Sequence, residues 1–145
     1  MNATPPRTSA RTLVLPVALV ALGLAGCSSL PFGLGDAPEP ALRVVSQPKG
    51  DGGTARMASF TLGEPGYVVV RADANGRPGQ VIGRTELLEA GAYQNVEVQI
   101  DPSRAGERVH PMLHVDDGDG TFEFPGDDGP ALVAGQPLSA PIDWR

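Results

Sequence analysis

Six acidic side chains crowd one short part of the chain and are separated by glycines. The acidic residues are Asp116, Asp117, Asp119, Glu123, Asp127 and Asp128, and the glycines are Gly118, Gly120, Gly126 and Gly129. Calcium takes six to eight oxygen ligands, and a flexible glycine-rich backbone can gather them around the ion. The segment 116–128, which we call the acidic loop, is therefore a candidate calcium site.

The spacing within the acidic loop departs from that of an EF-hand. If Asp119 and Gly120 occupy positions five and six, Asp117 occupies position three, but Val115 falls at position one, where an acid is needed. Aspartate and glycine also favour turn geometry, so a solvated loop between two strands is the alternative interpretation. The sequence leaves both interpretations open.

A second set of metal-binding side chains precedes the acidic loop. His110, Met112 and His114 alternate with apolar residues, so a strand would place them on one face, about 7 Å apart at each step, with Asp116 next in line. Imidazole and thioether groups are copper ligands. Pro111, which suits an edge strand or a bulge, and the usual packing role of methionine favour a structural role instead.

The sequence contains none of the common catalytic motifs that we sought. It has no glycine-rich phosphate loop, no Gly-x-Ser-x-Gly and no His-Glu-x-x-His, and only two histidines could act as bases near neutral pH. A hydrolase built on carboxylates such as Glu97 and Asp101 is the third candidate function, after a structural or interaction module and a metal-binding module. We therefore expect the protein not to be an enzyme.

The elements that must position these residues are short strands. Gly 19 and Pro 15 discourage long helices, and in the most regular run Val96, Val98 and Ile100 alternate with polar residues. By the same pattern the further inward residues are Ala58, Phe60, Leu62, Val68, Val70, Ala72, Phe122, Phe124, Leu138, Ala140, Ile142 and Trp144. About seven strands at this spacing predict an all-β fold, an antiparallel immunoglobulin-like β-sandwich.

Two local features interrupt the predicted strands. Asn75-Gly76 and Pro78-Gly79 supply positive φ and a preset turn, which predicts a hairpin with a slightly long loop between the strands 67–72 and 80–84. The segment 86–90 is expected to form a single helical turn that ends at Gly91.

The N-terminus carries the features of an export signal. Arg7 and Arg11 precede an apolar run over 13–25, which is close to a secretory h-region and short of the roughly 20 residues that span a bilayer. The run ends in Leu24-Ala25-Gly26-Cys27, which resembles the lipobox of bacterial lipoproteins. This resemblance implies cleavage before Cys27 and acylation of that cysteine, for example with palmitate. An ordinary signal peptide that leaves a free thiol is the alternative.

These features predict three regions: a signal peptide over 1–26, the lipidated cysteine with a proline- and glycine-rich tether over 27–40, and a β-sandwich over 41–145. Removal of the signal leaves nine basic residues against 17 acidic ones, a net charge of −8. Such a charge disfavours nucleic acids and anionic headgroups, so the lipid on Cys27 is the expected membrane contact. We expect an extracytoplasmic, membrane-anchored protein of the cell envelope.

The predicted sandwich also resembles a family of domains of unknown function over about 41–144. The segments that carry the resemblance are Tyr67-Val68-Val69-Val70, Val81-Ile82-Gly83, residues 87–91, residues 95–98, residues 112–124 and Asp128-Gly129-Pro130. Members of that family are secreted or surface-anchored proteins of halophilic archaea and bacteria. The resemblance implies an extracytoplasmic β-rich module and no established activity.

Overall fold

The computed structural model describes residues 37–48 and 53–144, so the predicted signal peptide, Cys27 and most of the tether lie outside the described residues. Within these ranges every regular element is a strand, and no helix is long and apolar enough to cross a membrane. The strands are β1 (Ala41–Val44), β2 (Thr54–Leu62), β3 (Gly66–Ala74), β4 (Arg77–Arg84), β5 (Gly91–Gln99), β6 (Arg108–Val115), β7 (Leu132–Val133), β8 (Gln136–Pro137) and β9 (Ile142–Asp143).

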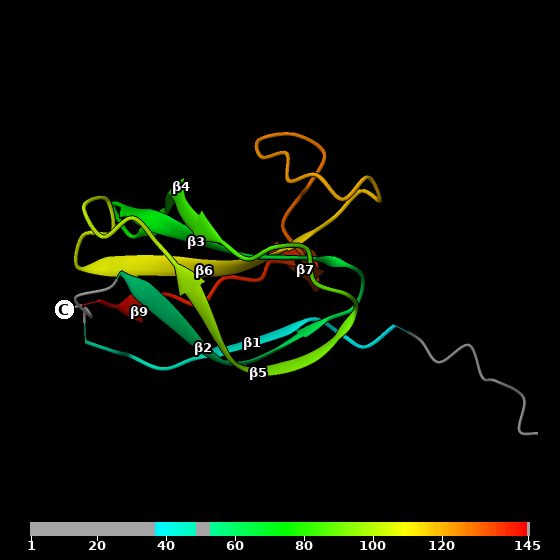
Figure 1. Ribbon diagram of the computed structural model, residues 1–145, viewed down its shortest axis with the longest axis horizontal. Coiled ribbons are helices and arrows are strands. Elements are labelled where there is room, and N and C mark those ends of the chain that lie inside the picture. The colour runs from blue at the N-terminus through cyan, green and yellow to red at the C-terminus, as the bar shows by residue number, and fades with distance from the viewer. Residues whose placement is uncertain (1–36, 49–52, 145) are drawn as a thin grey trace, which may run out of the picture. The chain divides into compact units, whose positions relative to one another are not determined.

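Seven of these strands form two sheets that face each other (Figure 1). The first sheet has the order β1-β2-β5 and the second has the order β4-β3-β6-β9, and all neighbours are antiparallel. This is the immunoglobulin order, except that the fourth strand pairs with the third instead of the fifth. Strands β7 and β8, which lie between β6 and β9 in the sequence, form a separate two-stranded sheet. The predicted all-β antiparallel sandwich is confirmed.

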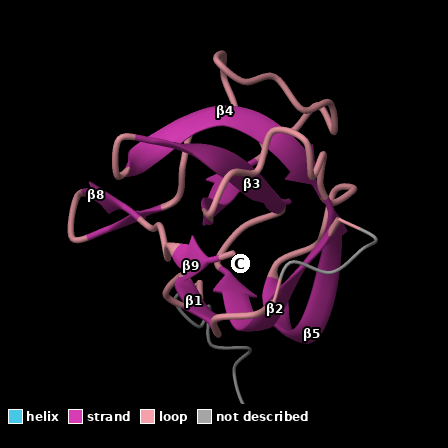
Figure 2. Ribbon diagram, turned by 90° about the vertical axis from the view of Figure 1, so that its left-hand side faces the viewer, coloured by secondary structure: helices cyan, strands magenta, loops and turns pink. Residues whose placement is uncertain are grey.

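The core lies between the two sheets. Its largest fully buried side chains are Trp144, Met57, Leu62, Leu113, Ile142, Val68, Val70, Val98 and Val109. Most of the predicted inward residues belong to the core cluster, including Val98 and Ile100 of the regular run, and Val96 packs against it. Isolated bridges join the sheets near their edges, Gly83 to Ile100 and Gln47 to Trp144, which gives the rounded cross-section of Figure 2.

The predicted inward position of Ala58 is wrong. Met57 is fully buried, whereas Ala58 is only half-buried, and the buried positions then resume at Phe60. The register between β1 and β2 shifts between Arg43 and Val44, opposite this point. An extra residue in one strand of a pair reverses the faces of all residues beyond it, so simple alternation fails across Ala58.

The hairpin between β3 and β4 exists, but its loop is shorter than predicted. Asn75 and Gly76 have φ values of 57° and 80°, so they alone form a two-residue turn. Pro78 and Gly79 lie inside β4, where its register with β3 shifts. The predicted longer loop is wrong because irregular pairing within the strands accommodates the second turn-like pair.

The predicted helical turn over 86–90 is also wrong. Leu88 instead exchanges two backbone hydrogen bonds of 2.9 Å with Gly66, so this segment runs beside β3. A Cβ at Gly66 would lie 2.1 Å from the carbonyl oxygen of His114, which makes glycine necessary for this three-segment contact. Backbone pairing with a distant segment has replaced the local helical turn.

Phe122 and Phe124 do not lie in a strand, contrary to the prediction. Both are half-buried residues of the irregular connection between β6 and β7. They pack on the outer face of the second sheet instead of its inner face. At the C-terminal side, Ile142 and Trp144 are buried as predicted, whereas Leu138 and Ala140 are half-buried.

Candidate functional site

The outer face of the second sheet carries most of the candidate metal ligands. Val109 and Leu113 belong to the core, so alternation along β6 places His110, Met112 and His114 on the outer face, as predicted. These three side chains are nevertheless buried, with exposed fractions of 3 %, 3 % and 0 %. The polypeptide between β6 and β9 covers this face, which we call the covered face.

Aromatic contacts hold the acidic loop on the covered face. The ring of Phe124 meets the ring of His114 edge-on with centroids 4.9 Å apart, and the ring of Phe122 meets that of Tyr67 at 5.1 Å. The guanidinium carbon of Arg71 lies 4.7 Å from the centroid of Phe124. Cation–π and edge-to-face contacts each contribute about 1 kcal/mol, so together they stabilise the docked loop.

Polar contacts complete this attachment. The Nδ1–H of His114 donates to the backbone carbonyl of Asp128 at 2.9 Å, and Nε2 is buried without a hydrogen-bond partner among the described residues. Burial lowers the pKa of His114, because desolvation disfavours the imidazolium. The buried Asp128 carboxylate accepts the backbone N–H groups of Asp117 at 3.2 Å and Glu123 at 2.6 Å. The two ends of the loop are thereby tied together.

Three of the six candidate calcium ligands come together. Oxygen atoms of Asp116, Asp117 and Asp128 all lie within 4.8 Å of one another. Oδ1 of Asp116 also accepts a hydrogen bond of 3.1 Å from the hydroxyl of Tyr67. Burial, the hydrogen bond to Asp116 and the nearby negative charges raise the pKa of Tyr67 to about 12. The cluster therefore sits at the border between the exposed loop and the covered face.

The other three candidates lie outside this cluster. Asp119 accepts the backbone N–H of Thr121 at 2.7 Å, which is a turn-forming contact. Glu123 and Asp127 are exposed and do not join the carboxylate group. Asp119 therefore fits the interpretation that the aspartates form turns. The interpretation as a calcium site is reduced to Asp116, Asp117 and Asp128.

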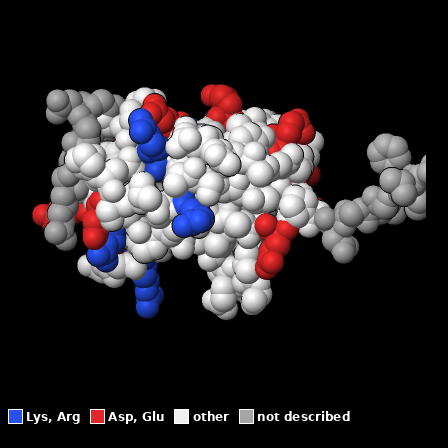
Figure 3. Space-filling model, turned by 90° about the horizontal axis from the view of Figure 1, so that it is seen from below, with Lys and Arg blue, Asp and Glu red and all other residues white. Residues whose placement is uncertain are grey.

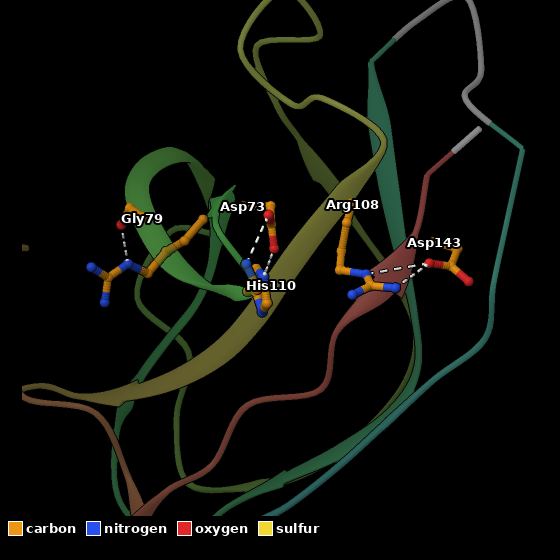
Figure 4. Close-up of polar contacts among 7 residues, drawn as sticks. Asp73, Gly79, Arg108, His110 and Asp143 are labelled. Atoms are coloured by element: carbon orange, nitrogen blue, oxygen red, sulfur yellow. Dashed lines mark hydrogen bonds and ion pairs between the residues drawn. The ribbon is translucent and has the colours of Figure 1, made fainter.

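The predicted copper ligands share a face but have other partners. The Nε2 of His110 lies 2.7 Å from Oδ1 of Asp73, and Nη1 of Arg71 lies 3.9 Å from the sulfur of Met112 (Figure 4 shows the His110 contact). The hydrogen bond to His110 is the main cause that lowers the pKa of Asp73. A guanidinium beside the thioether of Met112 disfavours a copper ion at the same place, because like charges repel. Copper binding by His110, Met112 and His114 stays a prediction.

Two exposed arginine–carboxylate pairs escaped the sequence analysis. Arg108 pairs with Asp143 at 3.0 Å, beside His110 and Asp73 in Figure 4. Arg56 pairs with Glu97, one of the two carboxylates considered for a hydrolase. The other, Asp101, accepts the backbone N–H and hydroxyl of Ser103 in a turn. The alternating pattern could have identified these side chains as outward-facing. It could not have shown that they pair, because alternation does not specify which strands are neighbours.

Comparison with known proteins agrees with the resemblance seen in the sequence. Cell surface glycoprotein 2 of Haloarcula hispanica is 35% identical over 98 residues, which cover 66% of this chain and 10% of that protein. Cell surface glycoprotein 1 of the same organism is 32% identical over 97 residues, with the same coverage. The chain thus spans about a tenth of the length of these relatives. No solved structure matches the chain.

The family comparison covers nearly the whole described domain. The model of a family described as a domain of unknown function, DUF7282, matches residues 40–143. This range begins just before β1 and ends with β9, so it contains both sheets and the acidic loop. The chain therefore belongs to the DUF7282 family of domains.

Proposed function

We propose that this protein is a lipid-anchored, non-catalytic module of the cell envelope that serves as a structural or interaction domain. The observation that carries the proposal is the order of segments along the chain. A basic start and an apolar run, typical of an export signal, lead into Leu24-Ala25-Gly26-Cys27, which resembles a lipobox. A short proline- and glycine-rich segment follows, and then the family domain from residue 40. Two acyl chains provide stable anchoring, whereas one provides only marginal binding. The names of the two relatives support a cell-surface location.

Metabolic labelling with a palmitate analogue tests the anchor. We expect the wild-type chain to incorporate the label and to fractionate with membranes, and we expect Cys27→Ser to remain an unlabelled precursor. Ser28→Ala, one residue further, is the matched control and should be labelled normally. Full labelling of Cys27→Ser would exclude Cys27 as the acylation site. Absence of label from the wild-type chain would favour the alternative of an ordinary signal peptide that leaves a free thiol.

A second candidate function is binding of calcium at the acidic loop. The specific observation is the approach of Asp116, Asp117 and Asp128 within 4.8 Å. Three carboxylates this close repel one another, and a divalent cation would relieve the repulsion while using free lone pairs of oxygens that already accept backbone N–H groups. Eight basic residues precede residue 109 in the mature chain, and none occurs between Arg108 and Arg145, so the acidic loop contains no basic residue of its own.

Thermal unfolding of the full chain with added calcium tests this candidate. Calcium at 100 times its dissociation constant should stabilise the fold by about 2.7 kcal/mol, and magnesium should act less because it requires tighter octahedral geometry. Asp117→Asn should abolish the response. Asp119→Asn, whose carboxylate lies outside the cluster, should retain it.

The opposite pattern would refute calcium binding at the acidic loop. An equal response to calcium and to sodium chloride at matched ionic strength would indicate charge screening. A full calcium response in Asp117→Asn would place the ion elsewhere in the molecule.

A further inference from the structure

A hollow of about 480 Å³ opens at the edge of the first sheet where β1 ends. Strand β1 pairs only with the part of β2 from Met57 onward, so Thr54–Arg56 have no strand neighbour on that side. The hollow is lined by Val45, Gln47, Pro48, Thr54, Arg56 and Glu97. Its volume lies in the range of small-molecule sites, about 300 to 1,000 Å³.

The polar groups of this hollow hydrogen-bond to one another. Nε and Nη2 of Arg56 both donate to Oε1 of Glu97, at 3.2 and 2.5 Å. The side-chain amide of Gln47 donates to the backbone carbonyl of Arg56 at 3.1 Å and accepts its N–H at 2.9 Å. Gln47 therefore substitutes for the missing strand neighbour. Preorganisation of this kind lowers the entropic cost of binding.

The charge of the hollow selects the class of ligand. Among the described residues that line the hollow, the charged ones are Arg56 and Glu97, which neutralise each other, although the whole chain has a net charge of −6. Seen from the side of the first sheet, most of the surface is uncharged and the charged groups are scattered (Figure 3). An ionic ligand would have to compete with the existing ion pair, so a neutral ligand is favoured.

The remaining donors and acceptors refine this class. Nη1 of Arg56 is a free donor in the described structure, Oε2 of Glu97 is a free acceptor, and Val45 and Pro48 supply apolar surface. A hydroxyl group both accepts and donates, so neighbouring hydroxyls can bridge a guanidinium and a carboxylate while C–H groups cover the apolar wall. We propose that this hollow binds a neutral sugar unit.

Amide chemical shifts of the full chain in detergent test this proposal. The probes are the methyl glycosides of glucose, galactose, mannose and N-acetylglucosamine. Each is titrated to about 50 mM, which is well above a weak Kd of about 1 mM. We expect saturable shifts at Thr54, Arg56 and Glu97 with at least one probe. Glucuronic acid and glucosamine, the charged counterparts, should bind at least fivefold more weakly.

Two variants locate the effect. Glu97→Ala should raise the Kd about tenfold while leaving shifts in the second sheet unchanged, which shows that the fold is intact. Arg108→Ala, which breaks the other exposed arginine–carboxylate pair at a residue that does not line this hollow, is the matched control and should leave the Kd unchanged. The proposal is overturned if none of the four glycosides gives saturable shifts, or if both variants weaken binding equally.

Discussion

The outer faces of the two sheets differ although both arise from alternating sequences. In β5 of the first sheet, the outward residues Gln94, Glu97 and Gln99 are exposed. In β6 of the second sheet, the outward residues His110, Met112 and His114 are buried. At His114 the difference comes from the connection to β9, which folds back over the second sheet and places Phe122 and Phe124 against the imidazole.

This comparison shows that an insertion can create a second, smaller packed layer outside the sandwich. The extra layer buries both faces of strand β3. Val68 and Val70 point toward the core, Val69 points toward the covered face, and all three are fully buried. The acidic loop is therefore a docked part of the domain at its two ends, and only its tip is free of the sheet. The first sheet has no such layer over its outer face in the described chain.

The largest expected effect separates the core from the exposed face of β5. Val98→Asp should destabilise the protein by about 4 kcal/mol, because it buries an unpaired charge at a position that is 1 % exposed. Glu97→Gln, on the opposite face, should change stability by less than about 1 kcal/mol, since exposed ion pairs contribute little. Urea unfolding measures both values, and equal midpoints would contradict the assignment of the two faces.

A smaller effect should follow from removing the aromatic contacts of the covered face. Phe124→Ala should cost about 2 kcal/mol, because it removes half-buried apolar area and the contacts with Arg71 and His114. Glu123→Ala changes an exposed neighbour and serves as the control. Hydrogen exchange should show faster exchange at the Asp117 amide in Phe124→Ala only. Unchanged exchange there would mean that the loop is held independently of the phenyl ring.

The covered face should also respond to mild acid. The folded pKa of His114 is lowered, so the unfolded chain binds its proton first as the pH falls below the ordinary value of about 6.5. Stability due to neutral His114 is present above that pH and is lost as the pH falls toward the folded pKa. His114→Gln should flatten this part of the stability profile. A profile that keeps the same slope in the variant would assign the acid sensitivity to other groups.

An alkaline counterpart is expected at Tyr67. Its folded pKa is raised to about 12 from the ordinary value of 10, so the unfolded chain loses this proton first as the pH rises. Stability due to neutral Tyr67 is present below pH 10 and is lost between about pH 10 and 12. Ultraviolet titration of tyrosinate should show one late-ionising phenol that is absent in Tyr67→Phe. Two phenols with ordinary titration would contradict the contact with Asp116.

Strand alternation in the sequence predicts burial correctly at some residues and fails at others. Alternation placed Val98 and Ile100 in the core correctly, because strand side chains must alternate wherever the pairing is regular. Alternation failed at Ala58, where a register shift changes the phase. The separate prediction of a helical turn failed at Leu88, which pairs with Gly66 instead. Such failures arise from contacts between segments that are distant in the sequence.

The same limit applies to the candidate sites. The acidic loop was recognisable because its ligands are contiguous, yet only folding selected Asp116, Asp117 and Asp128 from the six candidates. The hollow beside Arg56 and Glu97 was not recognisable, since the two residues are 41 positions apart and meet only through the pairing of β2 with β5.

The sequence by itself determined the strand-rich class and most of the inward positions, because backbone geometry links hydrophobic period to secondary structure. It also predicted an export signal and a lipobox ending at Cys27. Only the tertiary structure decided that Phe122 and Phe124 cover the second sheet, which made His114 a buried group. The physical reason is that burial on a second face depends on which distant segment packs there, and no local period encodes that choice.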